Sequence, residues 1–291
     1  MINQKLTIDD INLAGKRVLT RLDLNVPLKN GKITDTERIE RSLPTIRKIV
    51  SDGGIAILCS HLGRPKGERK PELSLAPVAE ALREMLGTDV VFVDDCIGEE
   101  VDRVVANAKA GDIILLENLR YHAGESKNDP EFAAKLASVA DVFVNDAFGT
   151  AHRAHASNVG VSNILGTAVA GYLLKEELTV FSRILNDPKR PFISIIGGLK
   201  VSSKASVIDN LLPKVDKLLI GGGVTYTFFK AQGIEIGKSF VEDEFIPTAK
   251  KLVDEHYGSD DSKIVLPIDV RCTDNFNEPT VVNEYPYNEI P

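Results

Sequence analysis

The chain is poor in cysteine, lacks long apolar runs and has no excess of positive charge. Its three cysteines, Cys59, Cys96 and Cys272, are widely spaced and form no CxxC pair, which argues against a disulfide framework and a zinc site. No apolar run approaches the roughly 20 residues that span a bilayer, and the first residues lack the layout of a signal peptide. We therefore expect a cytoplasmic protein without a membrane partner.

The charge balance is acidic, with 35 basic and 42 acidic residues and a net charge of −7. A net anion is not attracted to nucleic acid, so no nucleic-acid partner is expected. Any anion site must therefore come from a local cluster of basic residues. With 291 residues, 43% of them hydrophobic, the chain is long enough for about two domains with cores of their own.

Short apolar runs alternate with longer amphipathic segments along the chain. The predicted strands are residues 16–25, 54–60, 89–95, 112–119, 141–149, 191–198, 215–223 and 262–270. The predicted helices of the first half are residues 36–54, 75–87 and 129–140, with Gly53 and Gly87 in C-cap positions. Apolar strands separated by helices indicate parallel sheets that are covered on both faces.

This order of elements predicts an α/β fold with two Rossmann-like, doubly wound parallel-sheet domains joined by a helix. The joining segment places Leu174, Leu178, Phe181 and Leu185 on one helical face. We expect an N-terminal domain at 1–172, an interdomain helix and linker at 173–190, and a C-terminal domain at 191–291.

Polar side chains gather where the strands of the first half end. They include Arg21, Asp23, Asn25, His61, Arg64, Glu117, Asn118, Arg120, His122, Asn145, Asp146, His152, Arg153 and His155. Each alone has a simpler explanation as a solvated loop residue, and Arg38 alone would pair with Asp35 or Glu37 on the surface. However, arginines follow several strands at one predicted edge, and arginine binds phosphate and carboxylate groups bidentately. The pattern favours a site for a small, multiply charged anion, whereas the histidines lack the HExxH spacing of a zinc site.

The second half carries glycines where strands turn into helices. In residues 195–204, IIGGLKVSSK, Lys200 and Lys204 are predicted on one helical face after the glycine pair, and GGG at 221–223 follows the next strand. Tight turns use glycine for steric reasons alone, but the two lysines favour a nucleotide-phosphate site. Because GxGxxG is absent, an NAD-dependent oxidoreductase is not supported.

Six stretches resemble the phosphoglycerate kinase family in order and spacing. They are RLDLNVP (21–27), SHLGRP (60–65), LLENLRYHAGE (115–125), VNDAFGTAHRAHAS (144–157), GGLKVSSK (197–204) and LLIGGGVTYTF (218–228). The resemblance implies glycolytic phosphoryl transfer between 1,3-bisphosphoglycerate and ADP, which gives 3-phosphoglycerate and ATP. It also implies a monomer that uses Mg²⁺ together with ATP or ADP.

The resemblance implies roles for individual residues. Those that would bind the phosphoglycerate are Asp23, Leu24, Asn25, Arg38, His61, Leu62, Gly63, Arg64, Arg120 and Arg153. Those that would bind the nucleotide are Gly198, Lys200, Lys204, Gly222, Gly223 and Phe276. Arg38, Lys200 and Lys204 would act on the transferring phosphoryl group.

The sequence departs from the family pattern at three places. Leu199 stands where the family usually has Ala, and Ser203 stands where it usually has Asp. The chain stops at Pro291, whereas the family continues with a GGD[ST] loop, a glutamate for the ribose and an aspartate that holds magnesium. We therefore expect an incomplete second domain without a metal ligand, and the alternative is an inactive 3-phosphoglycerate-binding fragment or pseudo-enzyme.

Overall fold

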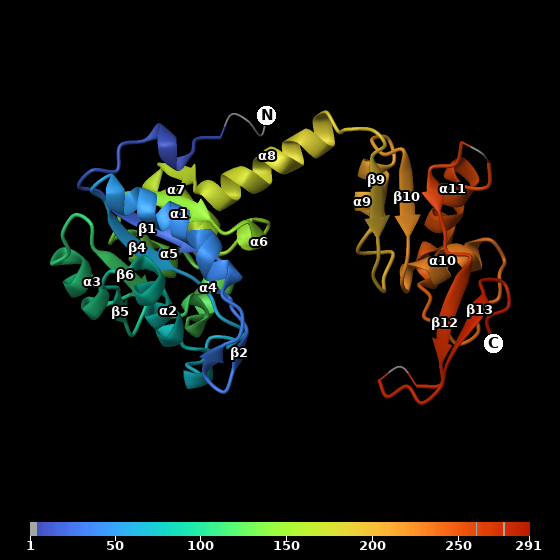
Figure 1. Ribbon diagram of the computed structural model, residues 1–291, viewed down its shortest axis with the longest axis horizontal. Coiled ribbons are helices and arrows are strands. Elements are labelled where there is room, and N and C mark those ends of the chain that lie inside the picture. The colour runs from blue at the N-terminus through green and yellow to red at the C-terminus, as the bar shows by residue number, and fades with distance from the viewer. Residues whose placement is uncertain (1–4, 260, 276) are drawn as a thin grey trace. The chain divides into compact units, whose positions relative to one another are not determined.

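The computed structural model describes residues 5–259, 261–275 and 277–291 of an α/β protein (Figure 1). The chain divides into two compact units, Met1–Ser182 (unit 1) and Arg183–Pro291 (unit 2). This division falls inside the helix α8, Tyr172–Asn186, and a separate linker at 173–190 stays a prediction. No helix among the described residues is long and apolar enough to cross a membrane.

The elements before α8 belong to unit 1, α8 spans the division, and the elements after α8 belong to unit 2. The first set is η2 (Ile8–Asp10), β1 (Arg17–Leu22), β2 (Leu28–Lys29), β3 (Lys32–Ile33), α1 (Glu37–Ser51), β4 (Ile55–Cys59), η3 (Pro71–Leu73), α2 (Ala76–Leu86), β5 (Val91–Val93), α3 (Glu99–Ala106), β6 (Ile113–Leu116), η4 (Leu119–Tyr121), α4 (Ala123–Lys127), α5 (Pro130–Ala137), β7 (Val142–Asp146), α6 (Phe148–Ala151), η5 (Ala156–Gly160), α7 (Val161–Leu165), β8 (Ala168–Ala170) and α8. The second set is β9 (Ile193–Ile196), α9 (Ala205–Leu211), β10 (Lys217–Ile220), α10 (Val224–Ala231), η6 (Asp243–Phe245), α11 (Ile246–His256), β11 (Ile264–Val265), β12 (Asp269–Thr273) and β13 (Val282–Pro286).

Unit 1 is built on a six-stranded parallel sheet in the order β5–β6–β4–β1–β7–β8 (Figure 1). Strands β4 and β6 are buried at every position, as expected for the centre of a parallel sheet. The chain moves from β1 to one side of the sheet and later crosses to the other side at β7. Such a reversal of direction is where α/β sheets bind ligands, at the carboxyl ends of the strands.

The side chains of the sheet alternate between two apolar cores. Leu19, Ile57 and Ile114 lie in register on three neighbouring strands and pack with residues of α3, α5 and α7. One position earlier in each of their strands, Val18 and Ala56 face the opposite core, which contains residues of α1 and α2. Helices therefore cover both faces of the sheet, and the doubly wound prediction is confirmed for unit 1.

The five strands predicted in the first half are all present but shorter than expected. Gly53 and Gly87 follow α1 and α2 with positive φ, as a C-cap glycine requires. The sixth strand, β8, was not predicted because its three residues carry little apolar surface. The hairpin β2–β3 was also missed, since each of its strands has only two residues.

Unit 2 contains a three-stranded parallel sheet in the order β11–β10–β9, with a separate antiparallel hairpin β12–β13. The predicted single strand at 262–270 is wrong, because β11 ends at Val265 and a new strand begins at Asp269. Pro267 lies between them and has no N–H to donate to a ladder. One face of β9 is open among the described residues, since Ile193 is 51% and Ile195 75% exposed.

Candidate functional site

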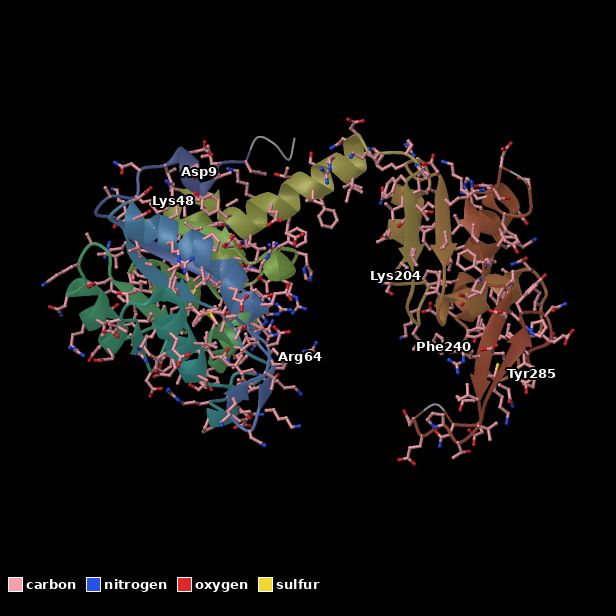
Figure 2. All side chains as sticks on the ribbon, in the orientation of Figure 1. Asp9, Lys48, Arg64, Lys204, Phe240 and Tyr285 are labelled. Carbon is pink, nitrogen blue, oxygen red and sulfur yellow. The ribbon has the colours of Figure 1, made fainter. Side chains whose placement is uncertain are left out.

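The predicted residues of the first half lie on loops at the carboxyl edge of the unit 1 sheet, apart from Arg38. Residues 23–25 follow β1, residues 61–64 follow β4, and Arg120 lies in η4 directly after β6. Arg153 follows the short helix α6, which comes after β7, and Arg38 lies in the first turn of α1. Arg64 is exposed at the surface of this unit (Figure 2).

Hydrogen bonds join the loops after β1 and β4. The backbone N–H of Gly63 donates to Asn25 Oδ1 at 2.8 Å, and the N–H of Leu24 donates to Ser60 Oγ at 2.9 Å. Arg120 Nη1 donates to the carbonyl of Gly63 at 2.8 Å. These contacts place Asn25, Gly63 and Arg120 beside one another, although they come from three different strand ends.

The buried amide of Asn118 fixes the loop that carries His61 and Arg64. Its Oδ1 accepts from the N–H groups of Leu62 and Arg120 at 3.2 and 3.1 Å, and its Nδ2 donates to the carbonyls of Leu62 and Leu73 at 2.7 and 2.9 Å. Gly63 has φ +62°, and a Cβ there would lie 2.7 Å from a methyl group of Leu73. A side chain at position 63 would therefore be strained by this φ and would have to displace the Leu73 side chain.

A buried chain of polar groups lies beneath this loop, which we call the Glu125 network. Glu125 accepts from the N–H and Oγ–H of Ser157 at 2.9 and 2.7 Å. Ser157 Oγ accepts from Arg21 Nε at 2.9 Å, Arg21 Nη1 donates to the carbonyl of Leu22, and Arg21 Nη2 lies 3.1 Å from His61 Nδ1. Arg21, Glu125 and Ser157 are fully buried.

The Glu125 network determines the tautomer of His61. A guanidinium group can only donate hydrogen bonds, so Nδ1 of His61 accepts from Arg21 and the ring proton lies on Nε2. Burial lowers the pKa of His61 to about 2, with further contributions from the charges of Arg21, Arg120 and Arg153. His61 is therefore a neutral N–H donor at physiological pH.

Positive charges outnumber negative ones around Arg120. Burial lowers the pKa of its guanidinium, and the neighbouring charges of Arg153, Arg21 and Arg64 lower it further, opposed by Glu125. The pKa of Glu125 is itself lowered, because its hydrogen bonds and the charge of Arg21 outweigh the opposite effect of burial. The arrangement has the electrostatics of an anion-binding site.

Asp23 and Arg38 form an ion pair at the same edge of the sheet. Arg38 keeps 49% of its side-chain surface exposed, whereas Asp23 keeps 14%. Oδ1 of Asp23 is buried and has no hydrogen-bond partner among the described residues, so this carboxylate keeps an unused acceptor.

In unit 2 the glycine turns after β9 and β10 pack directly on one another. A Cβ on Gly222 would lie 3.0 Å from the carbonyl oxygen of Gly198, and the N–H of Val224 donates to that carbonyl at 2.9 Å. A Cβ on Gly223 would lie 2.8 Å from a methyl group of Leu199. The contact between the turns thus requires glycine at 222 and 223, whether or not a ligand binds there.

The prediction that Lys200 and Lys204 share a helical face is wrong, because α9 begins only at Ala205 and both lysines lie in the preceding loop. The loop between β9 and α9 thus runs from residue 197 to residue 204, longer than the expected turn. The side chain of Lys204 still passes close to Gly198 (Lys204 is labelled in Figure 2), with its Cε 3.5 Å from a Cβ built there. Phe276 lies outside the described residues.

Sequence reasoning did not assign a role to Arg21, Asn118, Glu125 or Ser157. Arg21 and Asn118 could be noticed because they stand at strand ends. The partners Arg21 and Ser157 are 136 positions apart in the chain, so no local spacing could reveal that they meet.

Comparison with known proteins gives a consistent result. A family model described as phosphoglycerate kinase matches residues 8–291. The phosphoglycerate kinase of Chloroherpeton thalassium is 54% identical over 275 residues, which are 94% of this chain and 69% of that protein. The one of Thermosipho africanus is 53% identical over 269 residues, 92% of this chain and 66% of that protein. The chain thus spans about two thirds of the length of these relatives.

Solved structures match as well. The structure of phosphoglycerate kinase from Coxiella burnetii has a TM-score of 0.80 at 41% identity, and covers 99% of this chain and 72% of its own. Phosphoglycerate kinase from Pyrococcus horikoshii has a TM-score of 0.79 at 31% identity, and covers 97% of this chain and 71% of its own. The chain therefore belongs to the phosphoglycerate kinase family, a family of phosphotransferases.

Proposed function

We propose that unit 1 binds 3-phosphoglycerate or 1,3-bisphosphoglycerate, and that the whole protein transfers a phosphoryl group between the latter and ADP. The observation that carries this proposal is the cluster of cations around Arg120, whose pKa is lowered by burial and by Arg153, Arg21 and Arg64. Such mutual repulsion is relieved when a multiply charged anion binds among the guanidinium groups.

Each side chain of the cluster has a role that follows from its chemistry. Arg64, Arg120 and Arg153 offer charge-assisted hydrogen bonds to the phosphate, and His61 offers the neutral Nε2–H. Asp23 Oδ1 accepts from the hydroxyl group of the substrate. In this arrangement Asn25, Leu24 and the Leu62–Gly63 backbone shape the remaining wall.

The reaction needs positioning and positive charge more than it needs a base. The carboxylate of 3-phosphoglycerate is already ionised at pH 7, because carboxyl pKa values lie near 4. In-line transfer then depends on holding the two substrates and on stabilising the charge on the transferring group. Arg38 supplies that charge on the unit 1 side when it exchanges Asp23 for the carboxylate or acyl phosphate.

The proposal assigns the nucleotide to unit 2. Gly198, Gly222 and Gly223 would line its pocket, while Lys204 would bind nucleotide phosphate and Lys200 would lie near the transferring group. In terms of the chain, residues 1–172 form the phosphoglycerate-binding domain, 173–190 the connecting helix and linker, and 191–291 a part of the nucleotide-binding domain, in a monomer.

Magnesium does not fit the donors around the loop between β9 and α9. That loop supplies two lysines, two serine hydroxyls and backbone groups but no carboxylate, and both carboxylate oxygens of the nearby Glu242 accept hydrogen bonds from Ser202, at 2.9 and 2.7 Å. Mg²⁺ prefers oxygen ligands from carboxylates, water and phosphate. The proposal therefore includes Mg²⁺ only as an ion that accompanies ATP or ADP.

The experiment is an equilibrium titration of the purified chain with 3-phosphoglycerate and, in parallel, with glycerate, which lacks the phosphate. Arg64→Ala and Arg153→Ala should each weaken 3-phosphoglycerate about 10- to 150-fold, since a hydrogen bond to a charged group contributes about 1.5–3 kcal/mol. Glycerate binding should change much less. An equal loss of affinity for both ligands would contradict a phosphate site.

Arg69→Ala is a matched control from the same loop. Arg69 is also basic and exposed, but it forms an ion pair with Asp94 and lies 5.7 Å from the centre of the Tyr121 ring. Its removal should leave 3-phosphoglycerate binding unchanged within about twofold. A loss as large as that of Arg64→Ala would show that binding follows net charge alone.

A second candidate function is substrate binding without turnover by this 291-residue chain. The open face of β9, with Ile193 and Ile195 exposed, favours it because the sheet that carries the nucleotide turns is not fully covered. In that case the chain binds 3-phosphoglycerate but forms no ATP from 1,3-bisphosphoglycerate and ADP. Turnover at a rate typical of kinases, about 1–100 s⁻¹, would exclude this candidate.

A further inference from the structure

A second group of reactive side chains lies at the β5–β6 edge of the unit 1 sheet, where His122 follows Arg120 by two residues. Asp95 and Cys96 follow β5, and His122 follows β6 and η4. Strands β5 and β6 are parallel neighbours, so their carboxyl ends bring these three residues together. Asp95 and His122 are 27 positions apart in the chain, so no local spacing could predict the group.

The three side chains converge on one point. One carboxylate oxygen of Asp95, Sγ of Cys96 and one ring nitrogen of His122 all lie within 4.8 Å of one another. His122 Nε2 is already 2.7 Å from Asp95 Oδ1. Among the described residues, this is the one place where three metal-ligating side chains meet in this way.

We propose that Asp95, Cys96 and His122 form a binding site for a zinc-like divalent cation. Thiolate, imidazole and carboxylate are the ligands that Zn²⁺ and its neighbours in the transition series prefer, whereas Mg²⁺ and Ca²⁺ avoid thiolates. Bond lengths of about 2.0–2.3 Å place the ligand atoms of tetrahedral zinc roughly 3.3–3.6 Å apart. The His122–Asp95 distance of 2.7 Å therefore has to open by roughly 0.6 Å, while any distance near the 4.8 Å limit has to close.

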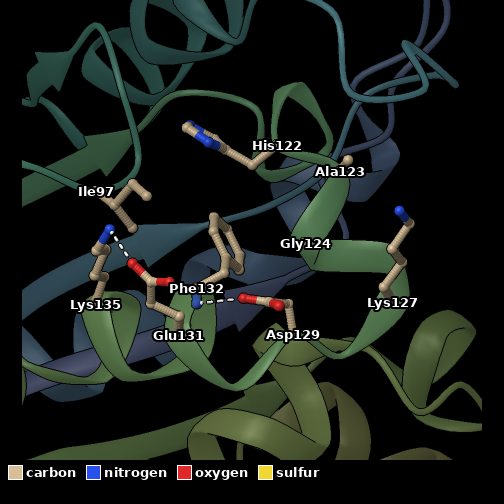
Figure 3. A pocket seen from close by; sticks show the side chains of 9 residues that line it. All are labelled: Ile97, His122, Ala123, Gly124, Lys127, Asp129, Glu131, Phe132 and Lys135. Carbon is tan, nitrogen blue, oxygen red and sulfur yellow. Dashed lines mark hydrogen bonds and ion pairs between the residues drawn. The ribbon is translucent and has the colours of Figure 1, made fainter.

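The surroundings hold the ligands in place. The N–H of Cys96 donates to Asp95 Oδ1 at 2.6 Å, and the Phe132 ring packs 5.3 Å from the His122 ring. His122 and Ile97 lie on the wall of a pocket of about 290 Å³ (Figure 3). Asp95 and Cys96 are not among the residues that line this pocket, so the group meets it only through His122.

Metal binding by these three side chains needs no oxidant, reductant or other reactant. The Cys96 thiol gives its proton to solvent and binds as the thiolate. His122 binds through Nε2, and the proton that Nε2 shares with Asp95 passes through solvent to Nδ1. Asp95 exchanges its hydrogen bond from His122 for a bond to the metal.

The test uses Co²⁺ as a spectroscopic probe for the zinc site. The purified chain is treated with a chelator, dialysed and titrated with Co²⁺, and the ultraviolet charge-transfer band of a thiolate–cobalt bond is recorded. We expect the band to saturate at one equivalent and to disappear when Zn²⁺ is added. Absence of the band at Co²⁺ concentrations well above that of the protein would overturn the proposal.

Variants assign the band to its residues. Cys96→Ser should abolish it, and His122→Asn, which changes a partly exposed side chain and spares the core, should weaken Co²⁺ binding at least tenfold. Two controls outside the group, Cys272→Ser and Asp94→Asn, should keep both the band and the affinity. Persistence of the band in Cys96→Ser, or unchanged affinity in His122→Asn with a native circular-dichroism spectrum, would also overturn the proposal.

Discussion

Glu125→Gln tests whether the Glu125 network supports the anion site from below. Glutamine has the same shape as glutamate and keeps one oxygen for Ser157, but it removes the negative charge that acts on Arg21. Arg21 is 0% exposed, so water cannot solvate its guanidinium in place of the lost Glu125 charge. We expect unit 1 to lose stability and the geometry of His61 to loosen.

The size of the effect follows from the contacts. Ser157 donates two hydrogen bonds to the carboxylate, at 2.9 and 2.7 Å, and hydrogen bonds to charged groups contribute about 1.5–3 kcal/mol each. Because glutamine retains part of these contacts, we expect a loss of about 2–3 kcal/mol in the free energy of unfolding. For a unit of this size that corresponds to a fall of about 4–12 °C in Tm.

The effect also depends on pH in a defined direction. The pKa of Glu125 is lowered from its ordinary value of 4.5 by its interactions with His155, Arg21 and Ser157, which outweigh burial. A carboxyl with a lowered pKa in the folded state stabilises the protein above its unfolded pKa, and the stabilisation is lost as the pH falls through the folded value. The difference between the wild-type chain and Glu125→Gln should therefore be full at pH 7 and shrink below about pH 4.5.

Urea unfolding followed by circular dichroism measures both quantities. Glu131→Gln is the control, because Glu131 forms an exposed pair with Lys135 at 2.9 Å, and water and salt screen such a pair so that it adds little to stability. The reasoning would be refuted if Glu125→Gln were no more destabilising than Glu131→Gln at pH 7. A difference from wild type that did not shrink in acid would refute the assignment to the carboxylate charge.

Three further predictions follow from the same geometry. In the intact enzyme, Arg38→Ala should lower turnover on the order of 100-fold or more while weakening 3-phosphoglycerate binding less, and turnover within about threefold, roughly 0.65 kcal/mol, would contradict a catalytic role. Nitrogen-15 NMR of His61 should show a neutral ring with the proton on Nε2 from pH 8 to pH 5, because burial lowers the pKa of His61 to about 2. A titration of His61 near pH 6.5 would contradict the burial argument. Gly171→Ala should destabilise unit 1 by about 1–3 kcal/mol, because a Cβ there overlaps the buried carboxylate of Asp146. Gly197→Ala, whose Cβ would meet its nearest atom at 3.8 Å, is the control with little expected change in urea unfolding.

The strand ends could be read from the sequence because long apolar runs determine where parallel strands lie. That logic placed Asn25, Arg64 and Arg120 at one edge, and their loops do meet there. It failed for Lys200 and Lys204, since neither glycine nor serine determines whether a turn or a helix follows a strand. It also could not show that Arg21 is buried, because burial of a guanidinium depends on a partner such as Ser157 that only the tertiary fold supplies.

The crowding of cations around Arg120 also bears on how this surface can evolve. With no ligand, Arg64, Arg120 and Arg153 repel one another, and a neutral residue in place of any one of them relieves that repulsion. Selection for stability alone would therefore favour replacement of these arginines, and only a requirement for ligand binding keeps them. Binding of the anion offsets the repulsion among the arginines, since a ligand present at 100 times its Kd adds about 2.7 kcal/mol to the free energy of unfolding. On the proposed function, the resistance of unit 1 to unfolding and proteolysis in a cell rises and falls with the supply of 3-phosphoglycerate.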